Sequence, residues 1–313
     1  MNVVVSPSGS ELLSDVCAVC EAVKSGQKFN LQTSGTTGEP KSIPVDLQAA
    51  FDAKKPGSSK ERWLLCYQPS RWAGVSVILH ALKSSCTLCV PASISILGLV
   101  EGISQLCPTH LSCTPSLFRN LVRTDEYGIL SRASFCQITF GGEAATQSVL
   151  DLAKFLWPQA RVSHVYASTE FGDICSVSDC RAGIPQEKFS RYTFSIEGEL
   201  VVNEIPTGDL WDLIDGRYHF RGRRDEIINV GGNKVSPIQI EEFAIQQGAT
   251  GARAFAISNA LMGSLVGLEY SGGLNEREMA LKFRSAFQKF AWPASLKKID
   301  YISITPAGKT KRI

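Results

Sequence analysis

Long apolar runs are missing from this sequence. Its 313 residues contain no stretch close to the roughly 20 apolar residues of a membrane helix, and the longest candidate, residues 75–82, is too short. The first ten residues also lack the basic start and apolar core of a signal peptide. We therefore expect a cytoplasmic protein without a membrane partner.

An excess of charge of one sign is also missing. The chain has 32 Lys and Arg against 30 Asp and Glu, and its net charge is +2. This balance gives no electrostatic footprint for nucleic acid, so we expect no nucleic-acid partner. An apolar content of 44%, with 26 Gly and 14 Pro scattered along the chain, excludes disordered and collagen-like proteins.

Cysteine is not scarce, but nothing in the sequence indicates secretion, so the ten cysteines are expected to be reduced thiols. Two Cys-x-x-Cys pairs, Cys17/Cys20 and Cys86/Cys89, contain the right residues for four zinc ligands. The 65 residues between the pairs far exceed the usual zinc-ribbon spacing. The favoured interpretation is therefore buried structural thiols.

The patterns present over most of the chain alternate between strand-like and helix-like segments. The expected strands are 29–33, 62–67, 86–90, 110–113, 136–140 and 161–167. The expected helices are 11–24, which starts at Ser10 and ends at Gly26, and 74–83, 95–106, 116–122 and 146–155. This rhythm predicts an α/β fold with a mostly parallel sheet covered by helices.

After Glu170 the segments become shorter and more β-like, including 191–202 and 217–221. Residues 221–313 carry 14 basic and 8 acidic side chains, whereas residues 1–220 carry 18 and 22. We therefore expect two domains, 1–223 and 224–313. The second is a basic, smaller α+β lid with helices at 237–246 and 275–287.

The strongest local signal is the segment 33–41, Thr-Ser-Gly-Thr-Thr-Gly-Glu-Pro-Lys. Glycines let backbone N–H groups approach an anion, hydroxyls donate further hydrogen bonds, and the lysine adds a positive charge. The segment predicts a phosphate-binding loop. It differs from a Walker A loop because Pro40, and not glycine, precedes the lysine.

Further signals follow along the chain. Tyr166-Ala-Ser-Thr-Glu170 ends one expected strand, and Gly141-Gly-Glu-Ala144 ends another, where ligands bind in open α/β sheets. Asp209 of Thr-Gly-Asp is suited to ribose hydroxyls, and Glu170 to Mg²⁺. A glycine-presented lysine, Lys309, lies near the end of the sequence.

Taken in chain order, these segments resemble the motifs of the adenylate-forming superfamily, which includes acyl-CoA synthetases, peptide-synthetase adenylation domains and luciferases. The matching segments are 33–41, 166–170, 207–209, the Gly-Arg-x-Asp hinge at 222–225, and the terminal Gly-Lys at 308–309. The compact form and the segment 112–118 look most like small synthetases such as o-succinylbenzoate–CoA ligase.

The resemblance implies a role for each matching position. The β- and γ-phosphates of ATP would be held by Thr33, Ser34, Thr36, Thr37 and Lys41. Adenine would be flanked by Gly141, Gly142, Glu143 and Tyr166, and the ribose held by Asp209 with Arg223 nearby. The catalytic residues would be Lys309, Thr169 at the α-phosphate, and Glu170 as the Mg²⁺ ligand. The lid would rotate at Asp225, the thiol tunnel would be lined by Gly231 and Gly232, and the acyl pocket by Arg71, Trp72 and Gly74.

The implied activity is ATP- and Mg²⁺-dependent activation of a small carboxylic acid to an acyl-adenylate, followed by thioester formation on CoA. Two alternatives stay open: loading of a phosphopantetheine carrier protein, and a non-catalytic nucleotide-binding relative. Three features depart from the family pattern. Only 32 residues precede Thr33, so the N-terminal subdomain is expected to be reduced. The stretch from Glu170 to Thr207 is short, and Ala167 replaces the usual glycine.

Overall fold

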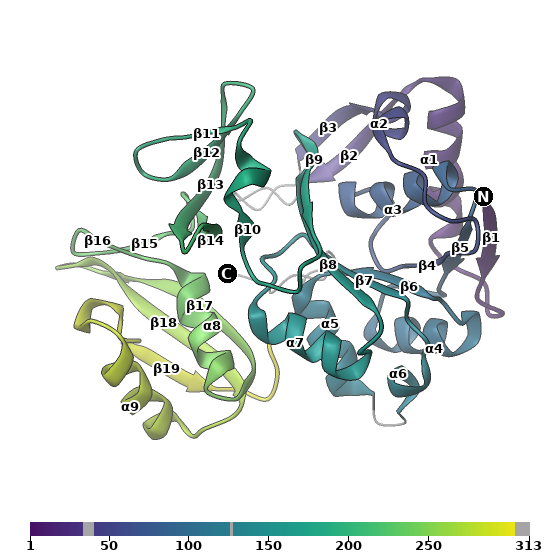
Figure 1. The fold of residues 1–313 in the computed structure, drawn as a ribbon. Coiled ribbons are helices and arrows are strands. Elements are labelled where there is room, and N and C mark those ends of the chain that lie inside the picture. Colours follow the sequence, from purple (N-terminus) through teal and green to yellow (C-terminus); the bar gives the residue numbers. More distant parts are fainter. Residues whose placement is uncertain (34–40, 126–127, 304–313) are drawn as a thin grey trace. The chain divides into compact units, whose positions relative to one another are not determined.

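The computed structural model describes residues 1–33, 41–125 and 128–303. The chain folds into two compact units, Met1–Arg181 and a second unit that begins at Ala182 (Figure 1).

A seven-stranded sheet forms the centre of the first unit, with the strand order β1-β5-β4-β6-β7-β8-β9. Every neighbouring pair is parallel except β8 and β9, which are antiparallel. The strands are β1 (Asn2–Val5), β4 (Arg62–Leu65), β5 (Thr87–Val90), β6 (His110–Cys113), β7 (Gln137–Gly141), β8 (Arg161–Ser168) and β9 (Gly172–Val177). The expected α/β class and mostly parallel sheet are confirmed.

Helices cover both faces of this sheet. In Figure 1, α1, α2 and α3 lie on one side and α4, α5, α6 and α7 on the other. Their bounds are α1 (Leu13–Ser25), α2 (Leu47–Ala53), α3 (Trp72–Lys83), α4 (Ile96–Leu106), α5 (Pro115–Thr124), α6 (Ile129–Arg132) and α7 (Gln147–Leu156). Strands covered on both faces must be apolar throughout, and Leu64, Leu88, Leu111 and Ile138 are fully buried.

One expected strand lies elsewhere. The segment predicted as 29–33 forms β2 (Lys28–Thr33), which pairs antiparallel with β3 (Lys41–Asp46) and does not join the large sheet. Thr33 lies opposite Lys41, so the predicted phosphate loop connects the two strands of a hairpin. The prediction that segment 29–33 belongs to the parallel sheet was therefore wrong. β3 follows β2 closely in the sequence, so the two strands can pair directly as antiparallel neighbours.

The first helix begins differently from the prediction. Its N-cap is Leu12, whose side chain makes no capping bond. Ser10 lies two residues earlier; its Oγ accepts from Leu12 N at 3.1 Å and donates to Pro91 O at 2.6 Å. The predicted end is confirmed, because Gly26 adopts the left-handed conformation of a C-cap, with φ +67°.

The second unit contains two antiparallel-rich sheets. One has the order β10-β14-β13-β12-β11 and the other β16-β15-β18-β17, with β19 parallel to β18. The first consists of β10 (Ile184–Pro185), β11 (Thr193–Phe194), β12 (Glu199–Val202), β13 (Ile205–Ile214) and β14 (Arg217–Arg223). The second consists of β15 (Ile228–Val230), β16 (Asn233–Val235), β17 (Ala249–Asn259), β18 (Gly263–Gly272) and β19 (Ser295–Lys298).

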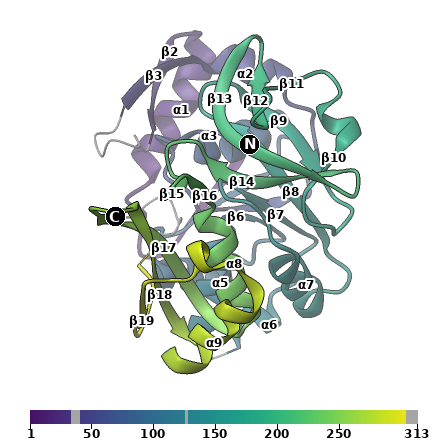
Figure 2. The same cartoon turned by 90° about the vertical axis from the view of Figure 1, so that its left-hand side faces the viewer.

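The helices α8 (Pro237–Gln246) and α9 (Glu276–Ala286) accompany the second of these sheets (Figure 2). Ile240 of α8 and Phe283 of α9 are fully buried in one core with the strand residues Leu268 and Tyr270. The predicted lid boundary at residue 223 coincides with the end of β14, between the two sheets, whereas the compact units divide at Ala182. The boundary of a rotating lid stays a prediction.

None of the ten cysteines, all of which the structure describes, forms a disulfide. Cys86 and Cys89 are buried, as expected, but Cys17 is exposed, so the interpretation as a buried thiol was wrong for this residue. It lies on the outer side of α1, three residues before the half-buried Cys20. No helix within the described part of the chain is both long and apolar enough to cross a membrane.

Candidate active site

The predicted site residues of the first unit follow the carboxyl ends of its parallel strands. Glu143 follows β7, and Thr169 and Glu170 follow β8. Tyr67, which was not predicted, follows β4 at the same edge. Because β4, β6, β7 and β8 run parallel, their carboxyl ends share one edge of the sheet. This is the edge at which open α/β sheets bind ligands.

Two contacts order the glycine-rich segment after β7. The Tyr67 hydroxyl donates to the Gly141 carbonyl at 3.5 Å, and the Ser116 N–H donates to Glu143 Oε2 at 3.0 Å. Burial, together with the neighbouring thiols of Cys113 and Cys66, raises the pKa of Tyr67 well above its usual value. The phenol therefore keeps its proton and remains a donor to this segment at physiological pH.

Thr169 and Glu170 lie in the tight turn between β8 and β9. Ser168 pairs with Gly172 across this turn, and the Phe171 N–H donates to Ser168 Oγ at 3.1 Å. Glu170 is exposed and Thr169 half-buried. Among the described residues, no three His, Cys, Asp or Glu side chains gather into a metal site. An exposed single carboxylate suits Mg²⁺, which binds through one or two carboxylates together with substrate phosphates.

The predicted acyl-pocket residues share the first turn of α3. Arg71 is the N-cap, and burial lowers the pKa of its half-buried guanidinium. Trp72 donates from Nε1 to Asp173 Oδ1 of β9 at 3.0 Å. A Cβ on Gly74 would lie 2.2 Å from the Gln68 carbonyl oxygen, so only glycine fits at this position.

In the second unit, the structure brings Asp209 and Arg223 together. They are paired residues on β13 and β14, and Arg223 Nη1 lies 3.3 Å from Asp209 Oδ1. Arg223 Nε also lies 3.5 Å from Asp225 Oδ1. Burial opposes the charge on Arg223, but Asp209, Asp225 and Glu226 outweigh it and raise the pKa of the guanidinium. Asp209 is only 8% exposed, so this arginine compensates a buried carboxylate.

Sequence reasoning missed Glu199, a buried carboxylate on β12. It accepts from the Gly208 N–H at 2.8 Å and forms an ion pair with Arg224. Gly208 belongs to the Thr-Gly-Asp motif and has φ +78°. Glu199 thus holds the irregular part of β13 that presents Asp209. The sequence contained one feature that could have indicated this residue. Glu199 begins the apolar segment Glu-Leu-Val-Val, in which a solvated side chain is not expected.

The predicted tunnel glycines form the tight turn between β15 and β16. Gly231 and Gly232 have φ +56° and +89°, and the Gly232 N–H donates to Asn229 Oδ1 at 2.9 Å. A Cβ on Gly231 would lie 2.4 Å from Met262 Cε. The turn therefore requires glycine for its backbone conformation, whatever ligand passes it.

Several predicted residues lie outside the described residues: Ser34, Thr36, Thr37 and Lys309. For Thr33 and Lys41 only the backbone pairing is described. Their roles stay predictions.

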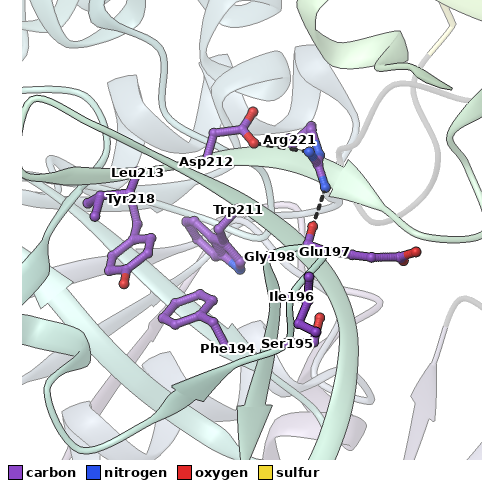
Figure 3. A pocket seen from close by; sticks show the side chains of 10 residues that line it. All are labelled: Phe194, Ser195, Ile196, Glu197, Gly198, Trp211, Asp212, Leu213, Tyr218 and Arg221. Carbon is purple, nitrogen blue, oxygen red and sulfur yellow. Dashed lines mark hydrogen bonds and ion pairs between the residues drawn. The ribbon is translucent and has the colours of Figure 1, made fainter. Parts of the chain in front are cut away.

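An open groove of about 360 Å³ on the second unit does not coincide with the predicted site (Figure 3). Phe194, Trp211 and Tyr218 line it, and Arg221 at its side is satisfied by Asp212 Oδ1 at 3.1 Å and by the Glu197 carbonyl. None of the predicted nucleotide-binding residues is among its lining residues.

Comparison with known families decides how these motifs are interpreted. The family described as AMP-binding enzyme matches residues 29–204, more than half of the chain. The chain belongs to the AMP-binding enzyme family. The resemblance to the adenylate-forming superfamily is thereby confirmed, and the match includes β2, the whole carboxyl edge from β4 to β8, and Glu199.

Two curated relatives act on carrier proteins, according to their names. The medium/long-chain-fatty-acid–[acyl-carrier-protein] ligase FadD10 of Mycobacterium tuberculosis is 23% identical over 90% of this chain and 64% of its own length. The 3,4-dihydroxybenzoate–[aryl-carrier protein] ligase of Bacillus anthracis is 25% identical over 90% of this chain and 71% of its own.

Two solved structures similar to this AMP-binding enzyme are CoA ligases. The anthranilate CoA ligase AuaEII, in complex with anthranoyl-AMP, has a TM-score of 0.71 at 17% identity, over 90% of this chain and 65% of its own. The o-succinylbenzoate CoA synthetase MenE of Bacillus subtilis has a TM-score of 0.66 at 18% identity, over 90% and 67%. The chain thus spans about two thirds of the length of these four proteins, and the two structures establish the shared fold.

Proposed function

We propose that this AMP-binding enzyme activates a carboxylic acid with ATP and Mg²⁺ and transfers the acyl group to the thiol of CoA. The observation that carries the proposal is the presence of five family motifs in family order. The one motif of the first unit that the structure describes, 166–170, lies at the carboxyl end of β8, at one edge of the parallel sheet. The family match includes this edge, and open α/β sheets bind their ligands at the carboxyl ends of their strands.

The first step would join two anions. A carboxylate oxygen of the acid attacks the α-phosphorus of ATP, the bond from this phosphorus to the bridging oxygen breaks, and pyrophosphate leaves. The acyl-adenylate that remains carries the activated carbonyl. The barrier is mainly electrostatic and geometric, so positive groups and fixed positions are what the protein must supply.

Particular residues are proposed for these tasks. Lys309 would bridge the substrate carboxylate and the nucleotide oxygens, and Thr169 would donate to the α-phosphate. Asp209 would accept from the ribose hydroxyls, with Arg223 compensating its charge at 3.3 Å. Glu170 would hold Mg²⁺, which when bound neutralises charge on the phosphates. The exposed position of Glu170 at the β8–β9 turn supports this assignment.

In the second step, a thiol attacks the activated carbonyl and AMP leaves, so no protein nucleophile is required. The similar CoA ligases favour CoA as acceptor, whereas the carrier-protein ligases among the relatives favour a phosphopantetheine carrier. The basic balance of residues 221–313 suits both anionic CoA and an acidic carrier. CoA is our first choice, and carrier loading is the alternative.

The acid itself is proposed more narrowly. MenE, named for o-succinylbenzoate, is among the similar structures, and o-succinylbenzoate carries a second carboxylate. The half-buried Arg71 at the start of α3 would suit such a group. An aromatic dicarboxylate is therefore the first substrate to test.

The test is pyrophosphate release from ATP and Mg²⁺ with aryl, dicarboxylic, fatty and amino acids, repeated with CoA and with a phosphopantetheinylated carrier. We expect acid-dependent release, and a loss of at least a hundredfold in Lys309→Ala while ATP still binds. Release that is unchanged in Lys309→Ala would contradict the assignment. ATP binding without release for any acid would favour the third reading, a non-catalytic nucleotide-binding relative.

A further inference from the structure

Four side chains from three elements of the first unit, α2, α3 and β9, meet beside the β8–β9 turn. Lys54, the C-cap of α2, donates from Nζ to Asp173 Oδ2 at 2.5 Å and to Ser76 Oγ at 2.6 Å. Trp72 donates from Nε1 to the other oxygen of Asp173, Oδ1, at 3.0 Å. Both carboxylate oxygens of Asp173 are therefore occupied, and they join α2 and α3 to β9.

The indole of Trp72 also packs against the turn itself. A Cβ placed on Gly172, whose φ is +68°, would lie only 3.2 Å from Cζ2 of Trp72. The absence of a side chain at Gly172 thus lets the ring approach the backbone between Glu170 and Asp173. Packing and a hydrogen bond fix the indole at the same place.

The place matters because the turn is short. Three residues, including Thr169 and Glu170, connect β8 to β9, and Asp173 is the second residue of β9. Its backbone pairs with Ala167, beyond the register shift of the two strands. A carboxylate held from outside the sheet at this point restrains the turn where the ladder is irregular.

We propose that Asp173 is a positioning residue, held by Lys54, that fixes the Trp72 wall of the acyl pocket against the turn carrying Thr169 and Glu170. The inference rests on the proposed function, because the acyl pocket and the turn acquire their roles there. Asp173 does not touch the reacting atoms in this proposal. It sets the distance between the group that contacts the acid and the groups that contact the phosphates.

The ionic part of the contact makes Asp173 sensitive to its partner. The Lys54 side chain is 14% exposed, so its ammonium is largely removed from water and depends on Asp173 and Ser76 for compensation. Asp173→Asn keeps an oxygen for the indole N–H but removes the charge. Asp173→Ala removes both. The two variants therefore separate the hydrogen bond to Trp72 from the ion pair with Lys54.

The kinetic test uses the acid that gives the fastest pyrophosphate release. We expect Asp173→Ala to raise the KM for this acid about tenfold while the KM for ATP changes less than twofold, and Asp173→Asn to recover part of the loss. In a Trp72→Phe background, Asp173→Ala should have almost no further effect on the acid KM, because the same contact is already broken. Asp52→Asn and Lys55→Met, exposed neighbours on and after α2, are the matched controls.

A ligand-free measurement keeps the proposal testable if no acid is activated. In amide hydrogen exchange, Asp173→Ala and Lys54→Met should speed exchange at residues 169–173 and in the first turn of α3, and the controls should not. Unchanged exchange there overturns the proposal. Faster exchange together with an unchanged KM for the acid also overturns the proposal. The same holds if Asp173→Ala and Trp72→Phe have additive effects on that KM. If the wild-type protein activates no acid but amide exchange is faster in both variants, only the proposed function is contradicted.

Discussion

The two units hold their candidate ligand-binding groups in different ways. In the first, the groups follow the carboxyl ends of parallel strands, and the strand direction places them at one edge. In the second, Asp209, Arg223 and Glu199 lie within or beside antiparallel strands and are bound to one another or to neighbouring charges. Topology arranges the first set, and a network of ion pairs and hydrogen bonds arranges the second.

This difference has a consequence for substitutions. A group on a turn such as Glu170 is exposed, so its loss should affect a ligand more than the fold. A carboxylate such as Glu199, at 3% exposure, also stabilises the backbone of β13 at Gly208, so its loss should affect both the ligand and the fold. Comparing binding with stability in each unit tests this distinction.

Among the substitutions that compare the two units, the largest effect is expected for the ribose-binding candidate of the second unit. Asp209→Ala should weaken ATP binding at least tenfold, because a buried acceptor for the ribose is lost and Arg223 keeps only Asp225 of its two carboxylate partners. Asp212→Ala is the matched control: Asp212 lies on the same strand and is also paired with an arginine, at 3.1 Å. Titration calorimetry measures both, and equal affinities would remove Asp209 from the nucleotide site.

Glu199 tests whether the network of the second unit also supports the fold. Glu199→Ala should lower the free energy of unfolding by about 2 kcal/mol, because the Gly208 N–H loses its buried acceptor. Glu199→Gln, which keeps an oxygen for this N–H, should cost less. Urea unfolding of both variants decides the point. If alanine and glutamine were equally tolerated, the backbone at Gly208 would not depend on this contact.

In the first unit, the carboxylate comparable to Glu199 is Glu61, which lies away from the candidate site and whose contribution to stability should depend on pH. Burial opposes the charge of Glu61, but hydrogen bonds from Trp63, Ser58 and His80 outweigh it and lower the pKa of the carboxyl. The folded pKa is below the unfolded one, so this stabilisation is present above about pH 4.3 and is lost as the pH falls through the folded pKa. Glu61→Gln should therefore cost about 1.5 kcal/mol at pH 7 and less at pH 3. Urea unfolding at both pH values measures this, and a cost independent of pH would show that charge has no part in the contact.

The smallest effect is expected for Tyr67→Phe. The variant removes a 3.5 Å hydrogen bond to the Gly141 carbonyl and should cost at most about 1 kcal/mol. Thermal unfolding measures the change. A loss of stability several times larger would mean that the phenol organises the carboxyl edge, and that topology alone does not arrange it.

Much of the fold could be predicted because it depends on local pattern. The strand at 110–113 and the helix at 237–246 have the predicted bounds, since apolar periodicity and a capping serine or proline mark them directly. β1 was missed because four residues at the start of the chain carry too short a pattern. The antiparallel pairing of β2 was missed because the sequence of one strand does not identify the strand with which it pairs.

The site shows the same division. The motifs placed Asp209 beside Arg223 through family resemblance, and their 3.3 Å contact follows from the pairing of β13 with β14. Glu199 and Asp173 were missed because neither belongs to a recognisable motif. Their importance lies in partners that are distant in sequence.

By itself, the sequence determined most helices and parallel strands of the first unit and the family of this AMP-binding enzyme, since each depends on short-range patterns of apolar, glycine and hydroxyl residues. Only the tertiary structure decided that Lys54 meets Asp173, 119 positions away, and that Glu199 meets Arg224, 25 positions away. Such contacts depend on which surfaces pack together, and that packing largely removes one charge of each pair, Lys54 or Glu199, from water.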